Sequence, residues 1–287
     1  MLPVALTIAG FDPSGGAGVI ADVKTFTALG CFATAAITSL TFQNTLGVFG
    51  ASHQTAETVR AQVLPVIEDF RVAAAKTGML PTREIILEVA RLFRETDLPA
   101  PVVDPVVRST SGYDLIERDA LNALITELVP LARLITPNIP EAERITGLKI
   151  RCEDDIRRAA QAIREMGARA VLIKGGHLGK DEGGRRKAES GKQKAEGRRQ
   201  TLEEKPSAVD LLDNEGRVTL FRGEWIETTS THGTGCTLSA AIAALLGRGL
   251  SLEKSIETAK HLVAEALRNA PGLGHGHGPI NTVTSDK

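Results

Sequence analysis

Residues 3–40, PVALTIAGFDPSGGAGVIADVKTFTALGCFATAAITSL, combine an apolar run, a glycine-rich loop, a helical pattern and a second apolar run. We expect strands over residues 3–9 and 33–40 and a helix over residues 17–29. The apolar runs are mostly continuous rather than alternating, which is typical of strands with both faces covered. This stretch therefore predicts a βαβ unit of an α/β fold.

The rest of the chain repeats this alternation. Further strands are expected over residues 73–77, 101–107, 131–136 and 170–174, and further helices over residues 55–70, 83–94, 118–129, 153–166, 236–246 and 252–269. Residues 209–212 and 217–221 predict a β-hairpin that turns at Gly216. We predict a single α/β domain over residues 1–287, with helices on both faces of a mostly parallel central sheet.

The composition argues against several classes of function. With 34 basic and 35 acidic residues, the net charge is −1, which gives no field that favours nucleic acid or an anionic membrane. The apolar stretches fall short of the roughly 20 residues of a spanning helix, and no basic segment precedes an apolar run at the N-terminus. Cys31, Cys152 and Cys236 lack C-x-x-C spacing, which argues against disulfides or structural zinc. We expect a cytoplasmic protein with small-molecule ligands.

Residues 179–206 depart from the α/β pattern. They are nearly all charged or small, with Ala188, Ala195 and Leu202 as the apolar residues of the middle part. Such a composition cannot pack a core. A lid or docking loop is one interpretation, and we favour a solvated, disordered insertion that carries no active-site residue.

The strongest local indication of chemistry is THGTGC, residues 231–236, directly before the helical run TLSAAIAALL. Closely spaced glycines at a helix start expose several backbone N–H groups, and these groups can hold an anion with the helix dipole behind them. The segment thus predicts an anion hole for phosphoryl transfer. Taken alone, it is equally consistent with an ordinary glycine-rich loop before a core helix.

A second glycine-rich loop, AGFDPSGGAG at residues 9–18, follows the first expected strand. Open α/β sheets form ligand crevices at this place, although the loop is also consistent with a tight strand-to-helix turn. Neither G-x-x-x-x-G-K-[ST] nor G-x-G-x-x-G occurs in the sequence. A P-loop kinase or GTPase and a dinucleotide site are therefore disfavoured.

Polar residues stand at three further strand ends: Asp104, then Asn138 with Glu141 three residues on, and Lys174. Because the carboxyl ends of parallel strands meet at one sheet edge, these side chains can share one crevice. Asp104 and Glu141 suit Mg²⁺, which takes a few carboxylates, waters and phosphate oxygens. Each residue singly is equally consistent with a helix cap or a surface charge.

Two further features leave alternatives open. The Gln43 amide can pair with the edge of a heteroaromatic ring, or Gln43 can cap a turn together with Asn44. His275 and His277 in GHGHG suggest a metal tract, but further ligands are not near in sequence. A flexible C-terminal loop is therefore favoured for the histidines.

The motifs taken together resemble those of the hydroxymethylpyrimidine and phosphomethylpyrimidine kinases, which are thiamine-biosynthesis members of the ribokinase superfamily. AGFDPSGGAG, FQNTLGV, KTGML, DPVV, TPNIPEAE, LIKGGH, THGTGCTLSAAIAA and APGLGHGHGPIN occur in the family's order across nearly the whole chain. The resemblance implies a Rossmann-like ribokinase fold. It also implies that Mg-ATP phosphorylates 4-amino-5-hydroxymethyl-2-methylpyrimidine and then its monophosphate, and it suggests a homodimer.

The resemblance implies roles for individual residues. Gln43 is similar to the family's pyrimidine-reading glutamine, and the substrate would also meet Asp12, Ala17, Met79 and Val106. ATP would be held by Asn138, Lys174, Thr231, Gly233 and Gly235, and Mg²⁺ by Asp104 and Glu141. The catalytic end would comprise Gly233, Thr234, Gly235 and Cys236. Many members carry lysine at the position of Thr110, so a phosphate-binding cation is missing there, for which Arg108 is a neighbouring substitute.

Sugar kinases of the superfamily have an aspartate base at the position of Cys236. A phosphomonoester is already ionised at neutral pH and needs mainly alignment and charge neutralisation, so a site without that carboxylate suits the second phosphorylation. A cysteine at a helix N-terminus can have a lowered pKa and assist the alcohol step as thiolate, or it can simply shape the pocket. The thiolate alternative predicts that Cys236→Ala harms hydroxymethylpyrimidine phosphorylation more than phosphomethylpyrimidine phosphorylation.

Two other functions remain as alternatives. Pyridoxal has a phenolic oxygen where the pyrimidine has an amine, so Gln43 and Met79 favour the pyrimidine only modestly over a pyridoxal kinase activity. A non-catalytic ligand-binding protein on a kinase fold is the second alternative. The intact Asp104, Glu141 and Lys174 argue against it, since a pure binder has little use for a phosphoryl-transfer site.

Overall fold

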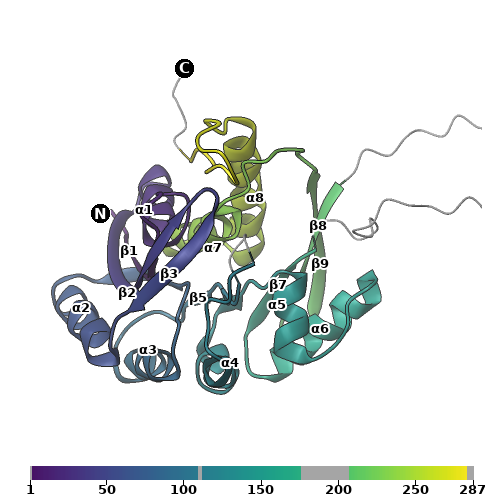
Figure 1. Cartoon of the computed structure of the whole chain (residues 1–287). Coiled ribbons are helices and arrows are strands. Elements are labelled where there is room, and N and C mark those ends of the chain that lie inside the picture. Colours follow the sequence, from purple (N-terminus) through teal and green to yellow (C-terminus); the bar gives the residue numbers. More distant parts are fainter. Residues whose placement is uncertain (1, 109–111, 176–206, 283–287) are drawn as a thin grey trace, which may run out of the picture.

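A single large sheet sets the position of the other elements. The computed structural model describes residues 2–108, 112–175 and 207–282. Nine strands pair in the order β3-β2-β1-β4-β5-β6-β7-β8-β9 (Figure 1). They are β1 Val4–Phe11, β2 Phe32–Asn44, β3 Gly47–His53, β4 Val72–Thr77, β5 Val102–Val103, β6 Leu134–Ile135, β7 Ala170–Lys174, β8 Ser207–Asn214 and β9 Arg217–Glu224. The pairs from β2 through β7 are parallel and those of β3, β8 and β9 antiparallel, which confirms the mostly parallel α/β sheet.

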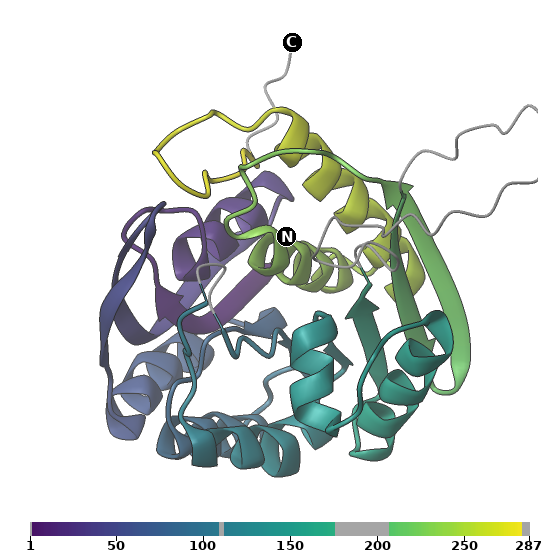
Figure 2. The same cartoon turned by 45° about the vertical axis from the view of Figure 1, so that its right-hand side comes forward.

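Helices cover both faces of this sheet. They are α1 Gly18–Ala28, α2 Ala56–Asp69, α3 Arg83–Glu95, α4 Arg118–Ala123, α5 Ile139–Thr146, α6 Glu153–Glu165, α7 Thr234–Gly247 and α8 Leu252–Arg268. Figures 1 and 2 show α1, α7 and α8 on one face and α2 to α6 on the other. No helix in the described ranges is long and apolar enough to cross a membrane.

The alternation of side chains along β1 builds a core on each face. Leu6 and Ile8 pack into the cluster that holds the buried residues of α2 to α6, whereas Ala5 packs into the cluster of Phe26, α7 and α8. Successive strand residues point to opposite faces, so one strand serves both cores. The continuous apolar runs of the central strands therefore follow from burial on both sides.

Hydroxyl side chains start several of the expected helices. Thr55 accepts a hydrogen bond from the Thr58 N–H at the start of α2, and Ser251 accepts one from the Lys254 N–H at the start of α8. These caps satisfy N–H groups that have no partner within the helix. The predicted helices over residues 55–70 and 252–269 are confirmed to within one residue at each end.

The structure also differs from the predicted elements in five places. β3 and α5 are additional, because the glycines of β3 and the proline of α5 obscure their periodicity. The strands expected over residues 101–107 and 131–136 shrink to two residues each. The helix expected over residues 118–129 passes from α4 into a π turn and then a 3-10 turn that contains Pro130, which has no N–H to continue the helix.

Two predictions fall on parts of the chain that the structure does not describe. The charged insertion over residues 179–206 and Thr110 both lie outside the described residues. The role expected for the insertion therefore stays a prediction, as does the consequence of Thr110. Arg108 is described, and its guanidinium pairs with Asp114 at 3.1 Å on the rim of the site.

Candidate functional site

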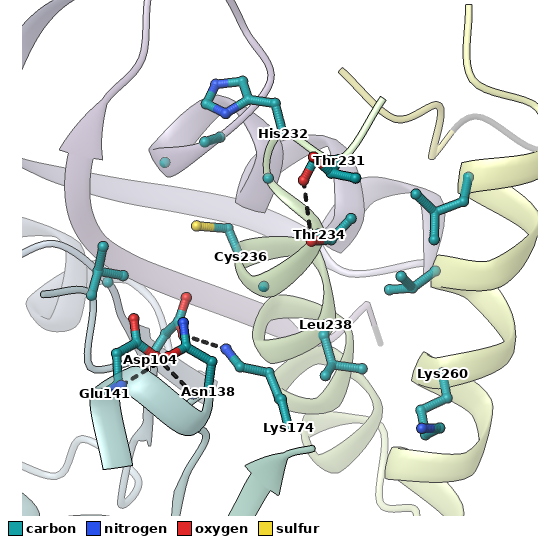
Figure 3. Close-up of a pocket in the computed structure, with 18 of the residues that line it drawn as sticks. Asp104, Asn138, Glu141, Lys174, Thr231, His232, Thr234, Cys236, Leu238 and Lys260 are labelled. Carbon is teal, nitrogen blue, oxygen red and sulfur yellow. Dashed lines mark hydrogen bonds and ion pairs between the residues drawn. The ribbon is translucent and has the colours of Figure 1, made fainter. Parts of the chain in front are cut away.

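One cavity of about 700 Å³ lies at the carboxyl edge of the parallel strands, with α7 and α8 along one side (Figure 3). Every residue with an expected site role lines it: Asp12, Ala17, Gln43, Met79, Asp104, Val106, Asn138, Glu141, Lys174, Thr231, Gly233, Thr234, Gly235 and Cys236. The glycine-rich loop before α7 thus shares a cavity with Asp104 and Gln43. The chemical roles of these residues stay predictions, while their convergence is observed.

A lysine and a carboxylate face each other at the ends of two strands. Lys174 Nζ, at the end of β7, lies 3.3 Å from Asp104 Oδ1, which directly follows β5 (Figure 3). Burial would raise the pKa of Asp104, but Lys174 and Lys76 outweigh burial and hold that pKa below its usual value. Asp104 is therefore an ionised carboxylate at neutral pH, close to a cation.

Asn138 and Glu141 form a capping box at the start of α5. The Glu141 N–H donates to Asn138 Oδ1 at 2.9 Å, and the Asn138 N–H donates to Glu141 Oε2 at 2.8 Å. The helix-cap alternative is thus observed for both residues, although both also line the cavity. Burial, with some repulsion from Asp104, raises the pKa of Glu141 to about 7 against the opposing pull of Lys174.

The loop before α7 has the geometry of an anion hole. Gly233 is the N-cap of α7 in the left-handed conformation, with φ of 82°. Among the described residues, no acceptor is hydrogen-bonded to the N–H groups of Gly235 and Cys236. A Cβ built on Gly235 would lie 3.1 Å from Lys174 Nζ, so the ammonium lies close to the start of α7. Free N–H groups and a nearby cation are suited to stabilising a phosphoryl group in transfer.

Asp12 joins the two glycine-rich loops. Its Oδ2 accepts hydrogen bonds from His232 Nε2 at 2.7 Å and from the Ala17 N–H at 2.8 Å. Its Oδ1 accepts from the N–H and Oγ of Ser14. Burial would raise the pKa of Asp12, but the hydrogen bonds from His232 and Ser14 lower it. The carboxylate therefore braces the anion hole against the N-terminal loop, and a contact with substrate stays a prediction.

Residues 272–279, which we call the C-terminal strap, hold the other side of the anion hole. The Gly278 carbonyl accepts from the His232 N–H at 3.1 Å, and the His277 N–H donates to the Thr45 carbonyl at 2.8 Å. A Cβ on Gly276 would lie 2.1 Å from the Thr45 oxygen, so only glycine fits this contact. The segment is a loop, as expected, and it is hydrogen-bonded to the β2–β3 turn and to the anion hole. Its flexibility stays a prediction.

The environment of Cys236 contradicts the lowered pKa that its helix position suggests. Burial raises the pKa of the Cys236 thiol to about 12, with Lys76 opposing the shift and Asp104 and Asp22 adding to it. The loss of water disfavours the thiolate more than the nearby Lys76 favours it. The thiolate alternative is therefore wrong for this site as it stands, and the pocket-shaping alternative is left.

We expect Cys236 to resist alkylation although it lines an open cavity. Iodoacetamide at pH 8 should modify the exposed Cys152 and leave Cys236 largely intact, because the thiol with the raised pKa stays protonated. Peptide mass spectrometry over time measures both sites in one sample. The alkylation rate of Cys236 should keep rising up to pH 10 without a plateau. A plateau of that rate near pH 7 would contradict the raised pKa of Cys236.

The cavity also contains charged residues without an expected role. Lys76 lines it, and the fully buried Asp22 is paired with Lys76. At the far end, Lys260 on α8 is paired with Asp210 on β8. A lysine inside the apolar run of β4 is a visible feature of the sequence, whereas nothing in the pattern of α8 marks Lys260.

The sequence is similar to those of several known enzymes. The sequence model of a family described as phosphomethylpyrimidine kinase matches residues 12–281. A hydroxymethylpyrimidine/phosphomethylpyrimidine kinase of Bacillus subtilis is 41% identical over 277 residues, which cover 96% of this chain and 93% of that protein. The protein of that name from Haemophilus influenzae is 41% identical over 278 residues, 96% of this chain and 95% of its own.

Solved structures give the same picture. A phosphomethylpyrimidine kinase from Clostridium difficile is 38% identical with a TM-score of 0.75, covering 93% of this chain and 99% of that one. A Bacillus subtilis pyridoxal kinase in complex with ADP is 32% identical with a TM-score of 0.81, covering 98% of both chains. A Staphylococcus aureus pyridoxal kinase with AMP-PCP and pyridoxal is 29% identical with a TM-score of 0.81, covering 98% of this chain and 94% of that one.

Proposed function

The chain belongs to the phosphomethylpyrimidine kinase family, and from that membership we propose that it phosphorylates hydroxymethylpyrimidine and then phosphomethylpyrimidine with ATP, for thiamine biosynthesis. One observation carries the proposal for the site. The free amides of Gly235 and Cys236 and the ammonium of Lys174 converge in the same cavity as Gln43 and Met79. Phosphoryl transfer needs alignment and charge neutralisation, and this arrangement supplies both.

We assign the acceptor to the half of the cavity near β1, β2 and β4. Gln43 lines it, and within the described parts of the chain its side-chain amide makes no hydrogen bond. The turn that follows is capped by Asn44 instead, whose Oδ1 accepts from the Leu46 N–H at 2.8 Å. The Gln43 amide is thus available to an aromatic ring with donor and acceptor edges. Ala17, Met79 and Val106 supply apolar walls for that ring.

We assign ATP to the half between β9 and α8. Its phosphates would meet Asn138, Lys174, Thr231 and the loop from Gly233 to Gly235, and the base would meet the apolar Ile226, Leu238 and Val263. Related structures that hold ADP or AMP-PCP support the choice of nucleotide. Apolar walls with a few convergent polar groups are typical of such pockets.

The carboxylates of Asp104 and Glu141 would hold Mg²⁺. Among the described residues no group of three or more His, Cys, Asp or Glu side chains can enclose a metal. Two carboxylates nevertheless fit Mg²⁺, which keeps several waters and takes its other oxygens from substrate phosphates. When bound, the ion would neutralise charge on the β- and γ-phosphates.

The described residues divide the work of transfer. The N–H groups of Gly235 and Cys236 would hold the oxygens of the moving phosphoryl group, and Lys174 would offset their charge. Because the Cys236 thiol stays neutral, it cannot accept a proton from the acceptor alcohol. The monophosphate needs no such base because its oxygen is already ionised.

The function is tested by ATP turnover with each acceptor separately. We expect ADP release with hydroxymethylpyrimidine and with phosphomethylpyrimidine, no release without an acceptor, and loss of activity when EDTA removes Mg²⁺. Pyridoxal is included because similar structures are pyridoxal kinases, and turnover with pyridoxal alone would replace the pyrimidine assignment. Absence of turnover with all three acceptors would leave only a ligand-binding protein.

We also propose that the protein is a cytoplasmic homodimer. The β2–β3 hairpin at the sheet edge exposes Phe42, Leu46 and Phe49, at 55%, 60% and 69% of their surfaces. Within the described ranges no strand pairs with the outer side of β3, and such an edge with apolar side chains suits association with a second copy. Three free cysteines suit a reducing compartment. Sedimentation of the purified chain as a monomer at micromolar concentration would overturn the dimer.

A further inference from the structure

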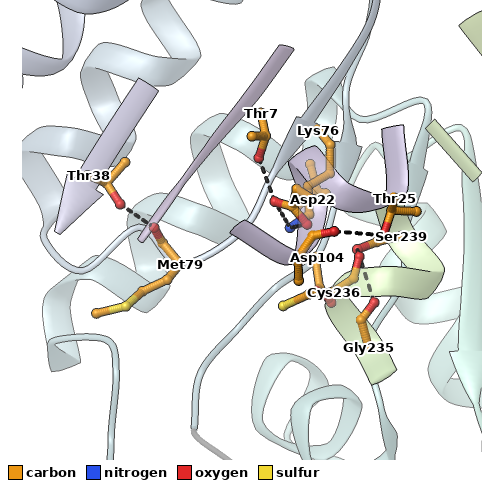
Figure 4. A network of polar contacts seen from close by, with 12 residues as sticks. Thr7, Asp22, Thr25, Thr38, Lys76, Met79, Asp104, Gly235, Cys236 and Ser239 are labelled. Carbon is orange, nitrogen blue, oxygen red and sulfur yellow. Dashed lines mark hydrogen bonds and ion pairs between the residues drawn. The ribbon is translucent and has the colours of Figure 1, made fainter. Parts of the chain in front are cut away.

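Among the described residues, Lys76 on β4 and Asp22 on α1 form an ion pair whose two side chains are both fully buried. Lys76 Nζ lies 3.0 Å from Asp22 Oδ1 and 2.8 Å from Asp22 Oδ2, and Thr7 Oγ1 donates to Oδ2 at 2.6 Å (Figure 4). Both carboxylate oxygens are therefore hydrogen-bonded. A buried ion pair is often no more stabilising than apolar side chains of the same volume, so stability alone does not account for it.

The positive end of this pair faces the cavity. Lys76 lines the cavity beside Gly78 and Met79, whereas Asp22 lies behind it on α1 and does not line the cavity. A Cβ on Gly78 would lie 2.9 Å from Lys76 Nζ. A side chain at this position would therefore clash with the ammonium, and glycine lets the backbone pass close to it. The pair is neutral as a whole, and it presents the positive end of its dipole to the acceptor half.

The ammonium keeps its proton despite its burial. Burial would lower the pKa of Lys76, but Asp22, with contributions from Cys236 and Asp104, raises that pKa above its usual value. Asp22 therefore secures the charge. A charge that water and ions do not reach is screened little by salt, and its influence extends further than that of an exposed lysine.

We propose that Lys76 determines which acceptor the enzyme prefers, by favouring the anionic phosphomethylpyrimidine over the neutral hydroxymethylpyrimidine. This inference rests on the proposed function. The two acceptors share one ring and differ mainly in charge. The fixed dipole of the Lys76–Asp22 pair, with its positive end toward the acceptor half, therefore attracts the anionic acceptor and has little effect on the neutral one. Lys76 is buried under Gly78 and needs no contact with the phosphate, because the attraction acts through space.

The test replaces both charged side chains of the pair together, so that neither is left buried without its partner. In Lys76→Met/Asp22→Asn, the asparagine oxygen can still accept from Thr7, so the variant should melt near the wild-type temperature. Because the variant removes one positive and one negative charge together, we expect kcat/KM for phosphomethylpyrimidine to fall about fivefold, the order of a dipole interaction in a partly buried site, and kcat/KM for hydroxymethylpyrimidine to fall less than about twofold. The exposed pair Lys149–Glu143, neutralised as Lys149→Met/Glu143→Gln, is the matched control and should change neither value.

A second variant keeps the test decisive if the double variant fails to fold. Gly78→Ala leaves both charges in place but forces the ammonium to move, and it should lower the preference for the monophosphate in the same direction. Equal losses on the two acceptors, or no loss, would show a purely structural pair and overturn the inference while the proposed function stands. A wild-type chain that phosphorylates neither pyrimidine would overturn the proposed function and this inference with it.

Discussion

Gly233→Ala is expected to lower kcat/KM for both pyrimidine acceptors by at least about 100-fold, the loss typical of removing one donor from an anion hole. The added Cβ would lie 1.8 Å from the Gly16 carbonyl oxygen, and φ of 82° disfavours any side chain. The loop that contains Gly233 must therefore shift away from the N-terminal loop. The N–H groups of Gly235 and Cys236 then no longer point at the phosphoryl group. Steady-state kinetics with saturating ATP measure the loss.

Gly249→Ala is the matched control for this variant. Gly249 has φ of 89°, and its Cβ would meet nothing within 4 Å. Both variants carry the same backbone penalty, of about 1–2 kcal/mol, but only Gly233→Ala meets a steric clash. If Gly249→Ala lost as much activity as Gly233→Ala, the loss would come from stability and the anion-hole assignment would fall.

Lys174→Met is expected to lower kcat/KM for ATP by about 100-fold or more, since it removes the cation that lies beside Gly235 in the proposed phosphate site. It also leaves the buried Asp104 carboxylate without the lysine that holds down its pKa. Removing one partner of a buried pair costs about 3–5 kcal/mol, so the melting temperature should fall as well. Kinetics below that temperature, together with thermal unfolding, separate the two effects.

Lys149→Met controls for loss of a lysine. Lys149 Nζ lies 3.3 Å from Glu143 Oε2, the same separation as between Lys174 and Asp104, but its side chain is 76% exposed rather than 17%. Exposed pairs contribute at most about 1 kcal/mol, so this variant should match the wild type in both assays. Unchanged ATP kinetics in Lys174→Met would remove Lys174 from the nucleotide site.

The sequence predicts the elements of this fold well where burial and periodicity agree. Residues 170–174 are β7 as expected, and Arg83 begins α3 as expected, because each segment shows the pattern of its own environment. β3 escapes prediction because Gly47 and Gly50 interrupt a strand whose Phe49 is exposed. The antiparallel edges of the sheet also depend on pairings between distant residues, which local patterns do not contain.

Some features of the candidate site can likewise be predicted from the sequence, and others cannot. Asp104 and Lys174 follow from their places at strand ends, since topology alone brings such ends together. The raised pKa of Cys236 cannot be predicted from the sequence. The sequence shows that Cys236 lies at a helix start, but it does not show that its thiol is buried. Asp22 and Lys76 are 54 residues apart, and only the packing of α1 against the sheet makes them a pair.

The C-terminal strap has a consequence for the order in which the protein is made. Residues 272–279 are translated after every strand of the sheet, yet they supply the Gly278 carbonyl that holds His232 and the backbone that meets Thr45. A ribosome-bound chain that has not yet released the strap can form its sheet while the loop at Gly233 lacks one of its two braces. Full nucleotide turnover is therefore expected only after residues 272–279 have emerged from the ribosome and docked against His232 and Thr45.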